Sequence, residues 1–214
     1  MTQVDNTLIL YNRAFKLALF TILFNTLEGL VSIFFGYSDQ SLTLFGFGVD
    51  SFIEVISGLG IAHMVLRIRR NPTDARHNFE KTALRITGLS FYSLVLGLIV
   101  TSINNLIKQI KPETTTAGVI ISLISIFTMV WLKNAKSKVG KDLNSSAILA
   151  DAECTQVCIY MSIVLLLASA IYELTKISYV DIIGSLGLAY FSFTEGREYL
   201  EKAARNKAER SNDE

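Results

Sequence analysis

The chain has 214 residues, of which half are hydrophobic and only 18% are charged, and its formal net charge is +1. A mean hydropathy of +0.41 is too high for an ordinary soluble domain of this size. With only two prolines and two cysteines, the chain fits neither a collagen-like nor a disulfide-rich secreted fold. The composition therefore indicates a membrane protein, and the near-neutral charge gives no support for a nucleic-acid partner.

Apolar blocks recur along the chain, each close to the length of about 20 residues that a membrane helix needs. We expect six spans, at about residues 14–36, 40–66, 83–107, 116–132, 146–171 and 177–195. No basic segment and no small-residue cleavage site precedes the first span, so we predict no cleaved signal peptide. The predicted fold is all-α, a six-transmembrane-helix bundle over residues 1–195 in the lipid bilayer, followed by a short charged cytoplasmic tail over residues 196–214.

Lysine and arginine are distributed unevenly between the two ends of these spans. One end receives seventeen of the twenty, including Lys136 in the expected loop 133–144, and the other receives only Lys108, Lys111 and Lys176. Short cytoplasmic loops are enriched in basic residues. We therefore predict that both termini are cytoplasmic, and we expect the host to be a prokaryotic plasma (inner) membrane.

Carboxylates interrupt the apolar blocks, and the second span carries Asp50 and Glu54. A charged side chain at the bilayer centre costs about 2.5 to 3.5 kcal/mol even on a lenient insertion scale, so it marks a candidate functional site. Residues four apart project from one face of a helix. Two carboxylates this close repel each other unless a cation or a shared proton lies between them.

The fifth span carries both cysteines, Cys154 and Cys158, at the same spacing of four. Two carboxylates and two thiolates supply the four donors of a tetrahedral site for Zn²⁺ or a similar divalent ion. When the sequence is shifted by 104 residues, Asp50 lies over Cys154 and Glu54 over Cys158, among neighbours of similar size. We interpret both helices as parts of one site. The alternative is that the cysteines are only packing residues.

Two further carboxylates are candidates for supporting roles. Glu28 in the first span either completes the site or hydrogen bonds within the bundle, and Asp151 either supports the ligands or caps the start of the fifth span. We expect no role in the site for Glu153 and Asp181. We expect a solvated role for His63 and His77.

At these residues the chain resembles the cation diffusion facilitator (cation efflux) family, six-span exporters of Zn²⁺ and related divalent metals. The family's helices 2 and 5 each carry a ligand pair at a spacing of four, after leads that Ser41-Leu-Thr-Leu-Phe-Gly and Ala147-Ile-Leu-Ala-Asp151-Ala match here. The resemblance covers essentially all six predicted spans. It implies that the metal ligands are Asp50, Glu54, Cys154 and Cys158.

The chain departs from the family pattern in three ways. Cysteines replace the usual His and Asp of helix 5, which makes softer ions such as Cd²⁺ plausible cargo, and Phe47 stands where Asp is usual. Only nineteen residues follow Glu195, so the resemblance is to a minimal branch that lacks the cytoplasmic C-terminal domain. We expect a homodimer formed through membrane helices, with Gly88, Ser93 and Gly97 on part of its face.

The function implied by the resemblance is export of Zn²⁺, or of Cd²⁺, Co²⁺ or Fe²⁺, from the cytoplasm by alternating access in exchange for protons. We expect no enzymatic activity and no cofactor apart from the transported ion. Two alternatives remain. One is a membrane thiol oxidoreductase that uses Cys154 and Cys158, and the other is a non-transporting membrane partner that keeps a degenerate metal site.

Overall fold

The computed structural model describes residues 3–70, 76–108, 112, 115–177 and 179–213, without the side chains of residues 3–6, 68–70, 76–84, 86, 87, 146 and 205–213. Within these ranges all regular secondary structure is helical. The six helices are α1 (Gln3–Ser38), α2 (Leu42–Arg70), α3 (Arg76–Lys108), α4 (Thr116–Asp142), α5 (Ser146–Thr175) and α6 (Tyr179–Asp213). The predicted all-α helix bundle is confirmed.

The helices extend beyond the apolar blocks that identify them. α2 ends at Arg70 and α3 begins at Arg76, so helix replaces most of the predicted loop between residues 67 and 82. α6 likewise continues through the charged tail. The chain has only two prolines, the residues that most strongly break helices. Pro112 lies between α3 and α4, and Pro72 falls outside the described residues. The basic segments therefore continue the helices beyond the apolar blocks.

Five of the helices, α1 to α5, contain windows long and apolar enough to cross a membrane. Large apolar side chains are exposed along the outside of the bundle, including Leu27 and Phe127. Helices suit this environment because they satisfy their backbone hydrogen bonds internally. The chain is thus a multi-pass membrane protein. Asp181 and Glu195 make α6 less apolar, and its crossing of the membrane stays a prediction.

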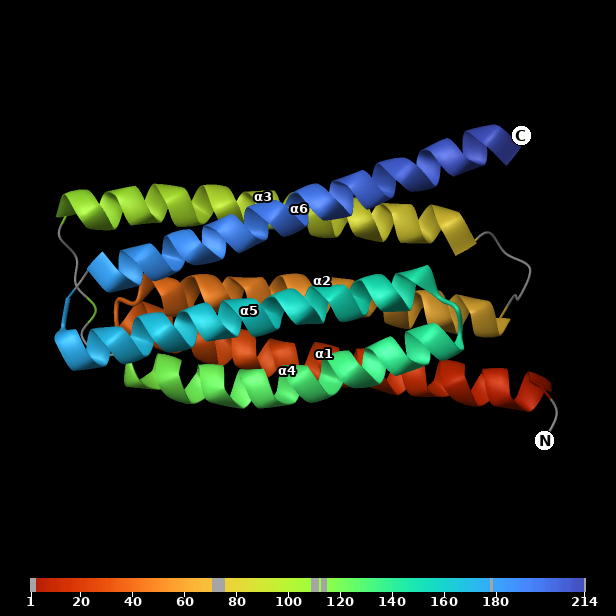
Figure 1. Cartoon of the computed structure of the whole chain (residues 1–214), viewed down its shortest axis with the longest axis horizontal. Coiled ribbons are helices and arrows are strands. Elements are labelled where there is room, and N and C mark those ends of the chain that lie inside the picture. Colours follow the sequence, from red (N-terminus) through yellow and green to blue (C-terminus); the bar gives the residue numbers. More distant parts are fainter. Residues whose placement is uncertain (1–2, 71–75, 109–111, 113–114, 178, 214) are drawn as a thin grey trace.

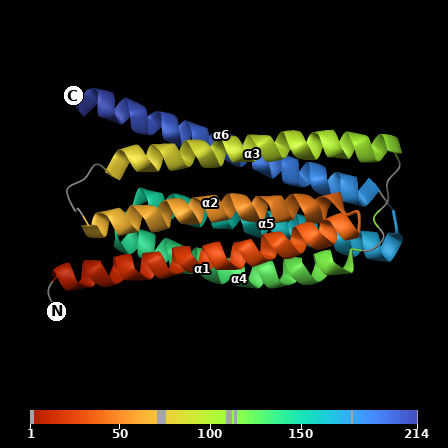
Figure 2. The same cartoon turned by 180° about the vertical axis from the view of Figure 1, so that it is seen from behind.

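The helices run roughly along one common direction. α1 packs most extensively on α2, α3 on α6, and α4 on α5. The start of α1 and the end of α6 lie at the same end of the bundle, together with the end of α2, the start of α3 and the connection from α4 to α5 (Figures 1 and 2). This arrangement agrees with the prediction that both termini share one side of the membrane. Which side is cytoplasmic stays a prediction.

Glycines allow α1 and α2 to approach closely beside the predicted ligands. A Cβ atom on Gly48 would lie 2.8 Å from the backbone nitrogen of Ile33, and one on Gly36 would lie 2.5 Å from the backbone nitrogen of Phe45. Both distances are too short for any side chain. The same close contact places Ser51, three residues after Gly48, where its hydroxyl donates a hydrogen bond to Glu28 of α1 (3.0 Å).

Gly88 does not belong to a free face of α3, so this part of the predicted dimer surface is wrong. A Cβ atom there would lie 3.1 Å from the carbonyl oxygen of Gly196, which shows that Gly88 serves the contact between α3 and α6. Ser93 is exposed, and Gly97 has open space around it. Sequence spacing groups the three residues, but it does not show which of them meets a neighbouring helix of the same chain.

Asp181 near the start of α6 caps the start of α2. Its carboxylate accepts hydrogen bonds from the Ser41 hydroxyl (2.8 Å) and from the backbone N–H groups of Leu42 (2.7 Å) and Thr43 (3.2 Å). The first N–H groups of a helix lack partners within the helix. Asp181 is therefore a structural residue that ties the two helices together, and it lies outside the predicted ligand set.

Candidate metal centre

The four predicted ligands lie in the interior of the bundle. α2 carries Asp50 and Glu54, and the neighbouring α5 carries Cys154 and Cys158. All four side chains are buried. Both thiols lie close enough to the two carboxylates to interact with them electrostatically. The structure therefore brings the two pairs to one interior region, as their spacing and the internal comparison indicate.

Asp50 and Cys158 meet directly across the interface between α2 and α5. The thiol of Cys158 donates a hydrogen bond to Oδ2 of Asp50, with 3.4 Å between sulfur and oxygen. The other carboxylate oxygen, Oδ1 of Asp50, is buried and has no hydrogen-bond partner among the described residues. Buried polar atoms are nearly always hydrogen bonded, so an unpartnered carboxylate oxygen needs an explanation.

Glu54 is held by a different set of contacts. Its Oε1 atom accepts a hydrogen bond from the Thr155 hydroxyl (2.6 Å) and lies 3.6 Å from Nζ of Lys136. Its Oε2 atom is buried without a hydrogen-bond partner in the part of the chain that the structure describes. Each of the two predicted carboxylate ligands thus has one buried oxygen without a hydrogen-bond partner among the described residues.

Lys136 was not expected in this place. The sequence puts it in a loop with Lys133, Lys138 and Lys141, and the loop is wrong, because Lys136 lies within α4 and is 1% exposed. The cytoplasmic side of this end stays a prediction. The Nζ atom of Lys136 lies 2.9 Å from Oδ2 of Asp151 and donates to the Thr155 hydroxyl at 2.9 Å.

A sequence signal for this burial exists. Lys136 continues the helical stripe that forms the buried face of α4, at intervals of three and four residues: Gly118, Ser122, Ser125, Met129, Leu132, Lys136, Val139 and Gly140. Such a stripe faces the core of a helix bundle. In the sequence this stripe is hard to recognise, because the neighbouring lysines at 133, 138 and 141 are typical of a solvated segment.

Asp151 supports this network and does not cap α5. The cap position of α5 is Ser145, six residues earlier, so the capping alternative for Asp151 is wrong. Its carboxylate accepts a hydrogen bond from Ser57 of α2 (2.9 Å) and pairs with Lys136. Asp151 therefore links α2, α4 and α5 next to Glu54, and its support of metal ligands stays a prediction.

Cys154 faces a different neighbour. Its thiol is hydrogen bonded to the oxygen of the Tyr199 hydroxyl. The single proton of that hydroxyl is donated to the carbonyl oxygen of Ala150 at 3.3 Å. Among the described residues, no group of three or more His, Cys, Asp or Glu side chains is arranged so that it could hold one metal ion. In this conformation Oε1 of Glu54 contacts Lys136 and Thr155, while Asp50 contacts Cys158. The four predicted ligands are therefore neighbours, but they do not surround one common point.

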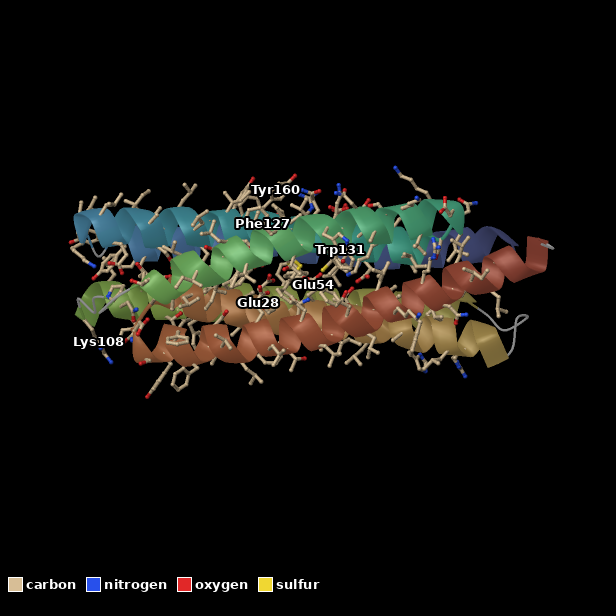
Figure 3. The ribbon with its side chains drawn as sticks, turned by 90° about the horizontal axis from the view of Figure 1, so that it is seen from below. Glu28, Glu54, Lys108, Phe127, Trp131 and Tyr160 are labelled. Atoms are coloured by element: carbon tan, nitrogen blue, oxygen red, sulfur yellow. The ribbon has the colours of Figure 1, made fainter. Side chains whose placement is uncertain are left out.

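Glu28 lies on α1, facing the same interior. Its carboxylate accepts a hydrogen bond from Ser51 of α2 (3.0 Å) and is hydrogen bonded to Ser125 of α4. It also interacts electrostatically with Asp50 and Glu54. Figure 3 shows Glu28 and Glu54 inside the bundle, about midway along its length. Both alternatives for Glu28 stay open, because a hydrogen-bonding role and a supporting role use the same position.

Two of the remaining titratable candidates, Glu153 and His63, have exposed side chains. Glu153 is exposed and pairs with Lys202 of α6. His63 is exposed on α2. His77 belongs to α3, but its side chain lies outside the described ones.

Comparison with known proteins supports the same reading of the helices. The family model for the cation efflux transmembrane domain matches residues 18–206, a range that includes part or all of each of the six helices. An uncharacterized transporter from Methanocaldococcus jannaschii is 27% identical over 157 residues, which are 71% of this chain and 52% of that protein. The chain thus spans about half the length of this relative.

Proposed function

Because this chain belongs to the cation efflux family, we propose that it carries a divalent metal ion across the membrane, with Zn²⁺ as the first candidate and Cd²⁺, Co²⁺ and Fe²⁺ as others. The observation that carries the proposal is the contact between Asp50 and Cys158 in the bundle interior. It joins a carboxylate and a thiol from two helices at the positions where the sequence predicts ligands.

The unpartnered oxygens favour a cation as the missing partner. Oδ1 of Asp50 and Oε2 of Glu54 are buried without hydrogen bonds among the described residues. A buried carboxylate oxygen without a hydrogen bond is costly, whereas a bound divalent ion can interact with one such oxygen from each group at once. Carboxylate oxygen together with thiolate sulfur suits Zn²⁺, and the sulfur also suits the softer Cd²⁺.

Transport by alternating access in exchange for protons follows from the chemistry of these ligands. Thiols and carboxylates bind a metal ion only when they are deprotonated, so metal binding releases protons and proton return favours metal release. A site near the middle of the bundle can be reached from either end in turn. The direction is export, since the family resemblance implies efflux, and the basic end of the bundle suits the cytoplasm.

The proposal includes a homodimer formed through membrane helices. On α3 the exposed Ser93 and the open space at Gly97 leave a place where a second helix can approach closely. A dimeric mass in nanodiscs of the purified protein supports this part of the proposal. A monomer in nanodiscs and in several mild detergents contradicts it and leaves the transport proposal intact.

The oxidoreductase alternative receives less support. Cys154 and Cys158 are free and buried, and they are hydrogen bonded to Tyr199 and to Asp50, respectively, and not to each other. Redox-active thiols instead occupy partly exposed, electropositive surroundings. The alternative also leaves Glu54 and the unpartnered oxygen of Asp50 without a role.

Flux measurements test the proposal directly. The purified protein is placed in liposomes that contain a fluorescent metal indicator, and Zn²⁺, Cd²⁺, Co²⁺, Fe²⁺ and Mn²⁺ are added in turn, with and without a pH gradient. We expect protein-dependent uptake of Zn²⁺ or Cd²⁺ that responds to the gradient. Binding without flux favours the non-transporting alternative, and failure to bind any of the five ions overturns the proposal.

A further inference from the structure

Lys136 is the only buried basic side chain among those that the structure describes. An ammonium group in a membrane interior is costly unless its charge and its three N–H donors are satisfied. It lies between two predicted functional carboxylates, Glu54 on α2 and Asp151 on α5. Membership of the cation efflux family does not by itself explain a buried basic side chain at this position.

The contacts of Lys136 are unequal. Its Nζ atom is 2.9 Å from Oδ2 of Asp151 and 2.9 Å from the Thr155 hydroxyl, but 3.6 Å from Oε1 of Glu54. The pairing with Asp151 is within hydrogen-bond distance, and the pairing with Glu54 is not. Lys136 can therefore give up Glu54 and remain paired with Asp151 and Thr155.

Glu54 takes part in two groups of residues. Oε1 faces Lys136 and Thr155, while its carboxylate also interacts with the thiols of Cys154 and Cys158. A metal ion bound to Glu54 would share this carboxylate with the ammonium group of Lys136. The two cations repel each other strongly in a low-dielectric interior.

We propose that Lys136 is a tethered competitor of the transported ion, whose ammonium neutralises Glu54 until a metal displaces it toward Asp151. This inference rests on the proposed function. Lys136 then acts twice in each cycle. It weakens metal binding by holding Glu54, and it promotes release by returning to Glu54 when the metal leaves, so that the carboxylate never remains unpaired.

Four variants of the full chain separate competition from a purely structural role. Lys136→Met removes the charge and keeps the length of the side chain, and Lys136→Arg keeps a charge. The double variant Lys136→Met with Asp151→Asn also removes the stronger partner, so that no new unpaired charge remains at Asp151. The matched control is Lys138→Met, an exposed lysine on the same helix.

Cd²⁺ binding to purified protein is measured by calorimetry at one pH, together with the rate of Cd²⁺ uptake into liposomes. We expect Lys136→Met and the double variant to bind Cd²⁺ about tenfold more tightly than the parent, because a competing cation is gone. Their maximal uptake should be slower, since release loses its assistance, so KM and kcat fall together. Lys136→Arg should bind more weakly than Lys136→Met, and Lys138→Met should behave like the parent.

A structural role for Lys136 predicts the opposite sign, because a loosened site binds Cd²⁺ less tightly. If the double variant keeps the parent's helical content and elution volume but binds Cd²⁺ equally or less tightly, the inference is overturned while the proposed function stands. If the parent protein itself binds no metal ion, the proposed function fails, and this inference fails with it.

Discussion

The thiol of Cys158 on α5 donates a hydrogen bond to the carboxylate of Asp50 on α2, with 3.4 Å between the two atoms. Cys154, one turn earlier on α5, is hydrogen bonded to Tyr199 of α6 instead. The two cysteines therefore have different surroundings, although the sequence treats them as an equivalent pair. Their substitution should reveal this difference.

Serine in place of each cysteine tests the sulfur ligands. A hydroxyl is a poor ligand for soft ions, so we expect Cys158→Ser to lower Cd²⁺ affinity by about tenfold or more, which corresponds to about 1.4 kcal/mol. Cys154→Ser should have the smaller effect. Binding isotherms for Cd²⁺ and Mn²⁺ measure both, and the loss should be much greater for Cd²⁺ than for Mn²⁺. Unchanged Cd²⁺ affinity in the double serine variant would mean that the cysteines are only packing residues.

Removal of the charge at the two predicted carboxylate ligands should abolish transport without unfolding the protein. Asp50→Asn and Glu54→Gln keep the size of each side chain, and loss of a buried charge relieves a cost of membrane burial. We expect metal uptake in liposomes to fall to the level of protein-free vesicles. Glu201→Gln makes the same charge change at an exposed position and serves as the control. Substantial transport by Asp50→Asn would exclude Asp50 as a required ligand.

The orientation of the bundle can be tested by labelling single cysteines in a background that lacks Cys154 and Cys158. Ser38 and Lys138 are exposed near opposite ends of the bundle. Since basic segments stay cytoplasmic, a membrane-impermeant maleimide added to intact cells should modify a cysteine at Ser38 and spare one at Lys138. The reverse pattern would place both termini outside. Permeabilised cells show whether each site can react at all.

The cap on α2 should contribute to stability and not to metal recognition. Asp181→Ala leaves the N–H groups of Leu42 and Thr43 without their acceptor, for which we expect a loss of about 2 kcal/mol of stability. Thermal unfolding in detergent, followed by circular dichroism, measures the effect. Glu198→Ala, which changes an exposed acidic residue of α6, is the control. A stable Asp181→Ala protein that has lost Cd²⁺ binding would instead give Asp181 a role in the site.

Hydrophobic block length and basic-residue asymmetry are properties of the sequence itself, and they were sufficient to predict the six-helix bundle. The spacing of four residues likewise predicts that Asp50 and Glu54 share one face of a helix, and that Cys154 and Cys158 share another. The comparison at a shift of 104 residues adds that the two faces serve one region. These predictions depend only on helical periodicity and on the cost of placing charge in a bilayer.

Only the tertiary structure shows where Lys136 lies and which partners the ligands have. Periodicity assigns a residue to a face of its helix, but it does not say which helix packs on that face. A lysine near the end of a membrane helix can extend to the headgroups or turn inward to a carboxylate. For Lys136 the choice depends on Asp151 and Thr155, which lie on another helix, and for Gly88 it depends on Gly196 of α6. Such long-range packing contacts arise only when the helices assemble.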